Sequence, residues 1–260
     1  LRFDNGIMSG DCEHCEIWTP DGYHIHSVSG SAAVGRGKTL VNDIRIIDDW
    51  SDLKLEYFSM TYRHCLMFRQ FTDSVSLGGK IIPSTLSFQT LKNIVGIMPK
   101  NTVLLNLEGG EVHGPVNNLT INSLAFHEKA SGLKAKVNRI TLLGLDSGQP
   151  CFTADIPAIS VSSQRLPGFL RRFAGTQGIN LPEGIGLRLA VKGAGSLNDF
   201  DATVKIASNI GEVHSELSVL NLVKPGRKPE IEGMLTVNQV NAGSVLGIEE
   251  LGKISLDTKV

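Results

Sequence analysis

The sequence Ile185-Gly-Leu-Arg-Leu-Ala-Val-Lys192 decides the fold class, because its side chains alternate strictly in character. Aliphatic residues occupy the odd positions from 185 to 191, whereas Arg188 and Lys192 lie at even positions. A period of two is the pattern of a strand with one apolar face and one solvent-facing face. The segment therefore predicts a half-buried β-strand.

The same alternation continues outward from this segment. After a turn through Gly195–Asp199, the stretch Phe200-Asp-Ala-Thr-Val-Lys-Ile206 again places apolar side chains on one parity. Other strand-like runs are Val41–Ile47, Leu53–Phe58, Val75–Leu77, Val103–Leu107, Leu119–Leu124, Leu133–Val137, Val213–Val219, Ile231–Val237 and Ile254–Val260. Turn residues separate these runs at short intervals, which is typical of an antiparallel meander.

Helical periodicity is confined to two short segments. Ser84–Met98 ends before Pro99, and Gln164–Gly175 carries apolar residues at helical spacing. Two such helices are too few to cover so many half-apolar strands, so another sheet, a membrane or lipid has to cover the rest. We therefore predict a mainly β fold, with a long curved antiparallel sheet that forms an elongated β-groove. This groove is an open, barrel-like sheet (a β-taco) with one or two short helices.

Composition narrows the function classes. The 260 residues contain 25 Lys and Arg against 26 Asp and Glu, and this balance argues against a nucleic-acid partner. Hydrophobic residues make up 41% and charged residues 20%, which excludes a disordered chain.

We expect one continuous segment over 1–260, cut from a longer protein because it starts at Leu1. If the chain divides, the boundary is expected near 175–186. No strict internal repeat is found, only glycine-started strands from Gly184, Gly211, Gly233 and Gly252.

A glycine-rich stretch resembles a relaxed phosphate loop. Ala32-Ala-Val-Gly-Arg-Gly-Lys-Thr39 has the Lys38-Thr39 pair of such loops, with alanine at the usual first glycine. A functional loop needs a buried parallel strand before it and a helix after it. Here the preceding stretch is polar and the following stretch is β-branched. A glycine turn between two strands explains these residues better.

Cysteine and histidine residues near the N-terminus offer a candidate metal site. Cys12 and Cys15 have the spacing of zinc and redox pairs, and His24 and His26 follow closely. The two histidines are alternate residues of an expected strand, which does not match a zinc finger. Zinc binding, a local disulfide and unpaired thiols are therefore all left open. Cys65 and Cys151 are expected to be small buried residues.

No catalytic constellation emerges from the sequence. His64, His113, His127 and His214 have no neighbouring nucleophile, and no nucleophile-elbow pattern occurs. The pair Asp48-Asp49 is expected to be a solvated turn. We predict no enzyme activity, no catalytic residue and no cofactor.

Several strand-and-turn phrases resemble the large AsmA/TamB-like envelope proteins of Bacteroidetes, the translocation and assembly module family. The resemblance rests on Val41–Tyr62, Gly114–Ile121, Gly193–Val204 and Leu246–Asp257. A phrase with glycine, then Leu or Val, then Asn and Asp or Asn, then a strand occurs twice, at Gly114–Ile121 and Gly195–Val204. The resemblance covers the chain roughly from Cys15 to Val260.

The resemblance implies a periplasmic segment of an inner-membrane-anchored protein, whose membrane helix lies outside this segment. It also implies lipid transport between the inner and outer membranes, in support of outer-membrane biogenesis. Its implied partners are phospholipid acyl chains and an outer-membrane barrel assembly protein of the BamA/TamA type. Each acyl-chain methylene that such a groove buries contributes about 0.8 kcal/mol of binding free energy. This contribution needs no specific residues.

If the face formed by the odd positions of each run, counted from its first residue, is the inner one, it predicts the residues that line the groove. They are Ile185, Leu187, Leu189, Val191, Phe200, Val204, Ile206, Leu235, Val237, Ile254 and Leu256. A register error of one residue would invert this assignment. Two other functions stay open: a docking module that pairs its edge strand with a barrel protein, and a nucleotide-dependent device that uses Lys38 and Thr39.

Overall fold

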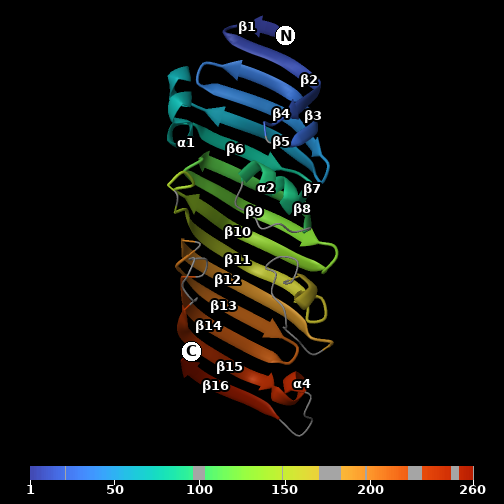
Figure 1. Ribbon diagram of the computed structural model, residues 1–260, viewed down its shortest axis with the longest axis vertical. Helices are drawn as coiled ribbons and strands as arrows, with labels where there is room; N and C mark the ends of the chain where they lie inside the picture. Colours follow the sequence, from blue (N-terminus) through green and yellow to red (C-terminus); the bar gives the residue numbers. More distant parts are fainter. Residues whose placement is uncertain are drawn as a thin grey trace. The chain divides into compact units, whose positions relative to one another are not determined.

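The computed structural model describes residues 1–20, 22–95, 103–147, 149–169, 183–196, 198–221, 230–246 and 252–259. The chain divides into two compact units, Leu1–His127 and Glu128–Val260. Both units consist chiefly of long antiparallel strands (Figure 1). The predicted mainly β fold is therefore confirmed.

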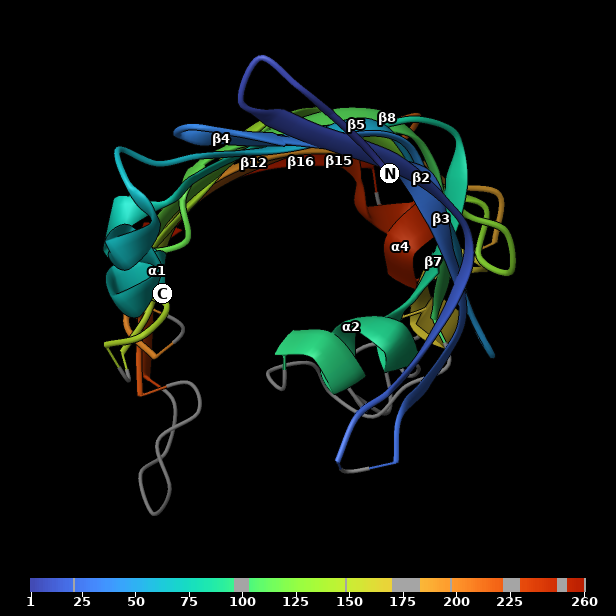
Figure 2. The same cartoon turned by 90° about the horizontal axis from the view of Figure 1, so that it is seen from above.

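Unit 1 is an antiparallel sheet with strand order β1-β2-β3-β4-β5-β6-β8-β9, and the short strand β7 pairs with both β5 and β8. Its elements are β1 (Arg2–Asp4), β2 (Ile7–Trp18), β3 (His24–Gly35), β4 (Lys38–Asp48), β5 (Asp52–Thr61), η1 (Cys65–Gln70), α1 (Phe71–Ser74), β6 (Ser76–Ile81), β7 (Ser84–Ser87), α2 (Phe88–Val95), β8 (Leu104–Pro115) and β9 (Asn118–Glu128). Figure 2 shows α2 on the inner side of the curved strands of this unit. There Phe88 is buried with Val103 and Leu105.

Unit 2 is a simple meander in which each strand pairs with the next one along the chain. Its elements are β10 (Leu133–Leu143), β11 (Cys151–Ser162), β12 (Gly186–Ser196), β13 (Phe200–Ser208), β14 (Gly211–Leu220), β15 (Glu230–Asn241), α4 (Ala242–Leu246) and β16 (Lys253–Lys259). Its buried apolar residues in the described part are Leu133, Ala135 and Val137 on β10, Val161 on β11, Ile185 before β12, Val219 on β14 and Ala242 on α4. The strands farther along the chain carry mostly half-buried aliphatic side chains.

Several boundaries differ from the expected ones. Residues 84–87 form strand β7 instead of the first turn of a helix, because β7 fills a gap between β5 and β8. In the second expected helix, residues 166–169 are helical and residues 170–175 lie outside the described part. Strands β2 and β11 were not expected, since neither alternates cleanly. The short helices are also more numerous than the one or two expected.

A backbone irregularity recurs three times and was not predicted. Within β4, β9 and β15, a residue in the left-handed region follows an asparagine and precedes an aliphatic residue. The three segments are Val41-Asn-Asp-Ile44, Ile121-Asn-Ser-Leu124 and Val237-Asn-Gln-Val240, with φ of 51°, 52° and 53° at the third position. In each case a glycine of the preceding strand approaches the aliphatic residue closely: Gly30, Gly110 or Gly211. Bulges of this kind bend a strand and increase its twist.

Candidate functional site

The strand register of unit 2 brings its aliphatic side chains together on one face. One cross-strand row runs over six strands and contains Ile159, Leu189, Ile206, Val213, Val237 and Leu256. A second row contains Ile156, Val191, Val204, Ser215, Leu235 and Thr258. Neighbouring strands lie about 4.8 Å apart, so a six-strand row spans about 24 Å. We call this surface the aliphatic face of unit 2.

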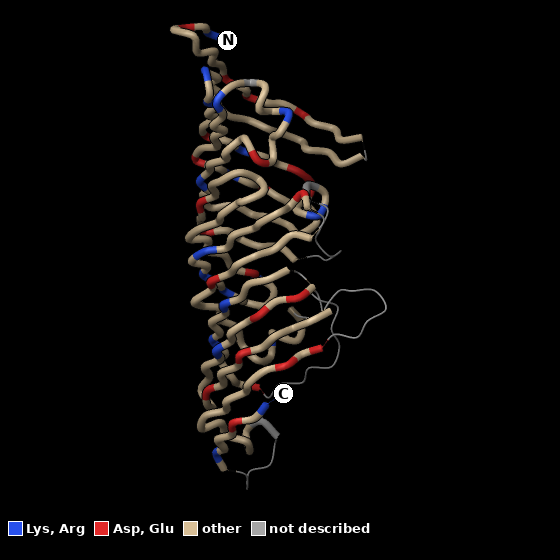
Figure 3. Tube along the Cα trace, turned by 90° about the vertical axis from the view of Figure 1, so that its left-hand side faces the viewer, with Lys and Arg blue, Asp and Glu red and all other residues tan. Residues whose placement is uncertain are grey.

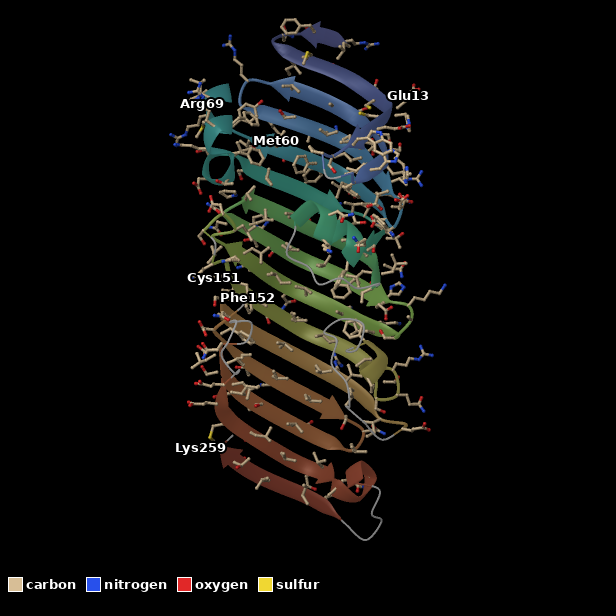
Figure 4. The ribbon with its side chains drawn as sticks, viewed as in Figure 1. Glu13, Met60, Arg69, Cys151, Phe152 and Lys259 are labelled. Atoms are coloured by element: carbon tan, nitrogen blue, oxygen red, sulfur yellow. The ribbon has the colours of Figure 1, made fainter. Side chains whose placement is uncertain are left out.

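Aromatic side chains close one end of the aliphatic face. Phe152 on β11 and Phe200 on β13 both lie opposite Gly195, and their ring centroids are 5.8 Å apart. Gly195 leaves room between the two rings because it has no side chain. Figure 4 labels Phe152 at this end of its strand. The row continues through Val219 to Ile231.

Most side chains of the aliphatic face are only half-buried. Leu189, Val204 and Leu235 fall in this class, and Leu256 on β16 is 51% exposed. In Figure 4 the sticks drawn across the middle of β11 to β16 are mostly carbon, and nitrogen and oxygen atoms gather at the margins. A large aliphatic area therefore stays in contact with solvent in the described part of unit 2. Contiguous exposed apolar surface of this kind marks a binding site more often than chance exposure.

The opposite face of the same strands is polar. Alternate positions carry Arg188, Lys192, Lys205, Glu212 and Glu216. Two hollows of about 1190 Å³ and 440 Å³ are lined mainly by side chains of this polar face. Lys192 also forms an ion pair with Asp155 across 3.6 Å. Charge on this face keeps it hydrated, so the two faces of the sheet differ sharply in polarity.

The structure places most of the predicted lining residues on one face. Leu187, Leu189 and Val191 pair with residues of β13 whose side chains lie on the same face, and the register continues this face to β16. Ile185 differs from the others because it precedes β12 and is buried, at 6% exposure. Ile254 is 47% exposed on β16. The predicted set lacks the residues of β11, where the register shifts between Ile156 and Ile159 around Pro157. It also lacks Val213 and Val219 on β14 and Ile231 on β15.

The candidate metal ligands do not converge. Cys12 and Cys15 are free and exposed on β2, and each Sγ lies nearest a backbone carbonyl oxygen. The ring of His24 stacks on Trp18 at 3.6 Å, and His26 Nε2 lies 2.5 Å from Asp49 Oδ1. Within the described residues, no group of three or more His, Cys, Asp or Glu side chains is arranged to hold a metal ion.

The structure also places the glycine-rich turn before Lys38 and the isolated cysteine Cys151. Arg36 and Gly37 form the turn between β3 and β4, as the glycine-turn interpretation predicts, and strand β4 starts at Lys38. Thr39 is buried, and its Oγ1 lies 3.2 Å from the Tyr62 hydroxyl. The prediction that Cys151 is buried is wrong, because its side chain is exposed at the start of β11. The Cys65 side chain lies outside the described set.

The expectation of a solvated turn at Asp48 is wrong. Asp48 is 7% exposed. Its carboxylate accepts hydrogen bonds from the Tyr23 hydroxyl at 2.5 Å and the Thr90 hydroxyl at 2.6 Å. It also accepts them from the backbone N–H groups of Trp50 and Ser51, at 2.8 Å and 2.6 Å. Asp48 thus joins strand β4 to the turn after it and to helix α2. No sequence pattern revealed this, since Thr90 lies 42 positions away.

This network makes the stability of unit 1 depend on pH. Burial, together with the nearby Asp48 carboxylate, raises the pKa of Tyr23 above its usual range. The protonated phenol is favoured in the folded state, so its stabilisation is complete below about pH 10, the ordinary tyrosine pKa, and is lost above it. We expect the free energy of unfolding, measured with urea, to decline more steeply above about pH 10 in the parent than in a Tyr23→Phe variant. Equal declines in the two proteins would contradict this role.

The comparisons do not assign the chain to a family. No protein-family model matches it, and no curated protein or solved structure shows significant similarity to it. A search of the described helices also finds none with the length and apolar character needed to cross a membrane.

Proposed function

We propose that the aliphatic face of unit 2 carries or shields the acyl chains of phospholipids. The observation that supports this is the continuous row from Ile159 to Leu256, which is aliphatic throughout but not buried. The row spans about 24 Å, and one acyl chain occupies about 15 Å, half of a hydrocarbon core of about 30 Å. A chain laid across these strands fits within the row. Each methylene removed from water contributes about 0.8 kcal/mol, before the costs of binding.

The chemistry of the face matches an acyl chain better than a polar ligand. Val191, Val204 and Leu235 offer only dispersion contacts, and Ser215 between them donates its hydroxyl hydrogen to the Met234 carbonyl oxygen. A ligand headgroup would lie outside the face, where charged residues of the margins and of the polar face contact water. This arrangement agrees with a site that takes lipids as a class.

The resemblance to AsmA/TamB-like proteins supports the same proposal and extends it. In that interpretation the chain is part of a periplasmic, inner-membrane-anchored protein that carries phospholipid between the two membranes. The second candidate function is docking of an outer-membrane barrel assembly protein on an edge strand. Strand β16 supports it, because Ile254 and Leu256 on it are half exposed and, among the described strands, β15 is the one that pairs with it.

Charge substitutions separate the two candidate functions. We expect a Leu189→Glu, Val204→Glu, Leu235→Glu variant to co-purify with roughly tenfold less phospholipid than the parent. The reason is that a carboxylate in contact with an acyl chain is poorly solvated. The matched control adds the same three negative charges one residue away on the polar face, at neutral residues, as Ala190→Glu, Thr203→Glu, Thr236→Glu. The measurement is native mass spectrometry with lipid extraction on both variants.

Three outcomes of this experiment are informative. Lipid in the parent and the control, with none in a folded aliphatic-face variant, supports the proposal. Equal loss in both variants would mean that added negative charge, rather than the face, controls capture. A folded parent without lipid would favour the docking function. Circular dichroism of each variant checks that its strands are intact.

A further inference from the structure

The turns at one margin of unit 1 bring several basic side chains together. This margin contains the turn after β1, the turn between β3 and β4, the segment Tyr62–Val75 and the turn between β8 and β9. It carries Arg36, Lys38, Arg63 and Arg69, all exposed. We call it the basic margin of unit 1. The strand register places these turns side by side, since Met8 pairs with Val34 and Lys38 pairs with Thr61.

Acidic side chains at the basic margin are few. They are Asp4 at the end of β1 and Asp73 on α1, and the Asp73 carboxylate accepts a hydrogen bond from the Asn117 side chain at 2.7 Å. The remaining titratable side chains in the turn segments are Tyr62, His64 and Cys65, which carry no charge in their ordinary neutral forms. The margin therefore has a clear positive excess, although the whole chain is nearly neutral.

The opposite margin of unit 1 has the reverse composition. Glu16, Asp48, Asp49 and Asp52 lie at or near its turns, with Arg45 and Lys54 as the facing cations. Arg45 and Lys54 both pair with Asp52, at 2.8 Å and 3.6 Å. Figure 4 labels Arg69 at one margin and Glu13 toward the other, and Figure 3 shows the acidic and basic positions along the trace. Unit 1 is thus polarised across its strands.

The basic margin also exposes large apolar side chains. Leu66 is 64% exposed and Phe68 is 41% exposed, both on η1 between Arg63 and Arg69. Phe68 contacts Tyr62 and Phe71, with ring centroids 4.8 Å and 6.0 Å apart. Tyr62 in turn donates its backbone N–H to Gly37 O at 2.9 Å. The projecting segment is therefore anchored to the turn that carries Arg36 and Lys38.

From these observations we propose that the basic margin of unit 1 docks on the surface of an anionic lipid bilayer. Arginine and lysine side chains attract anionic headgroups, and an exposed leucine and an aromatic ring between them insert at the boundary of headgroups and acyl chains. The opposite margin of unit 1, which carries Glu16, Asp49 and Asp52, is called the acidic margin. The anionic bilayer surface repels it, so unit 1 approaches the bilayer with its basic margin. The proposal does not depend on acyl-chain binding by unit 2.

The experiment is co-sedimentation of the 260-residue chain with vesicles of phosphatidylcholine alone or of phosphatidylcholine mixed with phosphatidylglycerol. We expect binding to the mixed vesicles only, with release as salt is raised. An Arg63→Gln, Arg69→Gln variant should bind roughly 25-fold more weakly, at about fivefold for each cation. The matched control, Arg45→Gln with Lys54→Gln, removes two cations from the acidic margin and should bind as the parent does.

A second pair of variants tests insertion. Leu66→Ser should weaken binding to mixed vesicles about tenfold. Leu104→Ser, which changes a 40% exposed leucine on β8 near the acidic margin, should not. Equal binding to both kinds of vesicle, parent-like binding of the arginine variant, or equal effects of a variant and its control would overturn the proposal. The aliphatic-face variant of unit 2 should bind vesicles as the parent does, which separates this docking from lipid capture.

Discussion

Replacement of Asp48 by alanine is expected to destabilise unit 1 by about 3–5 kcal/mol. The Asp48 carboxylate is 7% exposed and accepts hydrogen bonds from two hydroxyl groups and two backbone N–H groups. Its removal leaves these four donors without their acceptor in a buried place. Each buried donor that loses its partner costs about 1–3 kcal/mol, and relaxation recovers part of the sum.

The neighbouring residue provides the control for Asp48. Asp49 is exposed and contacts only the His26 ring in this region. Asp49→Ala should change the free energy of unfolding by less than about 0.5 kcal/mol. Both tryptophans of the chain, Trp18 and Trp50, lie in unit 1, so urea unfolding followed by tryptophan fluorescence reports on this unit. Similar midpoints for the two variants would contradict a structural role for the buried carboxylate.

Substitution of Gly211 by valine is expected to destabilise unit 2 by about 3–5 kcal/mol. Gly211 has φ of +140°, which residues with a side chain rarely adopt. A Cβ atom at this position would lie 2.5 Å from Val240 Cα, at the bulge of β15. Val240 Cα is a backbone atom, and the position of Cβ is fixed by the backbone of residue 211, so no side-chain rotation relieves the clash.

Gly186 provides the matched control on β12. It carries no backbone strain, and a Cβ there meets no heavy atom within 4 Å. Since valine favours strands, Gly186→Val should be neutral or slightly stabilising. Hydrogen exchange of the β14 and β15 amides measures the difference locally. Unchanged protection in the Gly211→Val variant would show that the close approach at the bulge tolerates a side chain.

Sequence patterns predicted the strands whose two faces differ most in polarity. The strand around Leu189 was expected at residues 185–192, and β12 spans Gly186–Ser196, so its start was predicted within one residue and its end four residues too early. Strand β11 was missed because Pro157 and the register shift near it interrupt its alternation. Helix α2 was expected too early because residues 84–87 pair with β8, and Thr85 also pairs with β5. This pairing depends on residues 17 or more positions away.

The candidate site was partly predictable for the same reason. Parity along each strand depends on local sequence, so Val204 and Leu235 were assigned to one face before their strands were paired. Burial of Asp48 depends on Tyr23 and Thr90, which come from elements distant in the chain. The basic margin was not predicted either, since antiparallel pairing is what brings Lys38 beside Thr61.

Photo-crosslinking at two adjacent residues tests the central claim most directly. Val204 lies on the aliphatic face of unit 2, and Thr203 lies on the polar face of the same strand. With p-benzoylphenylalanine introduced at each position in turn, irradiation should join phospholipid to the protein at position 204 and not at position 203. Equal lipid adducts at both positions, or none at position 204 in a folded protein, would contradict acyl-chain binding by the aliphatic face.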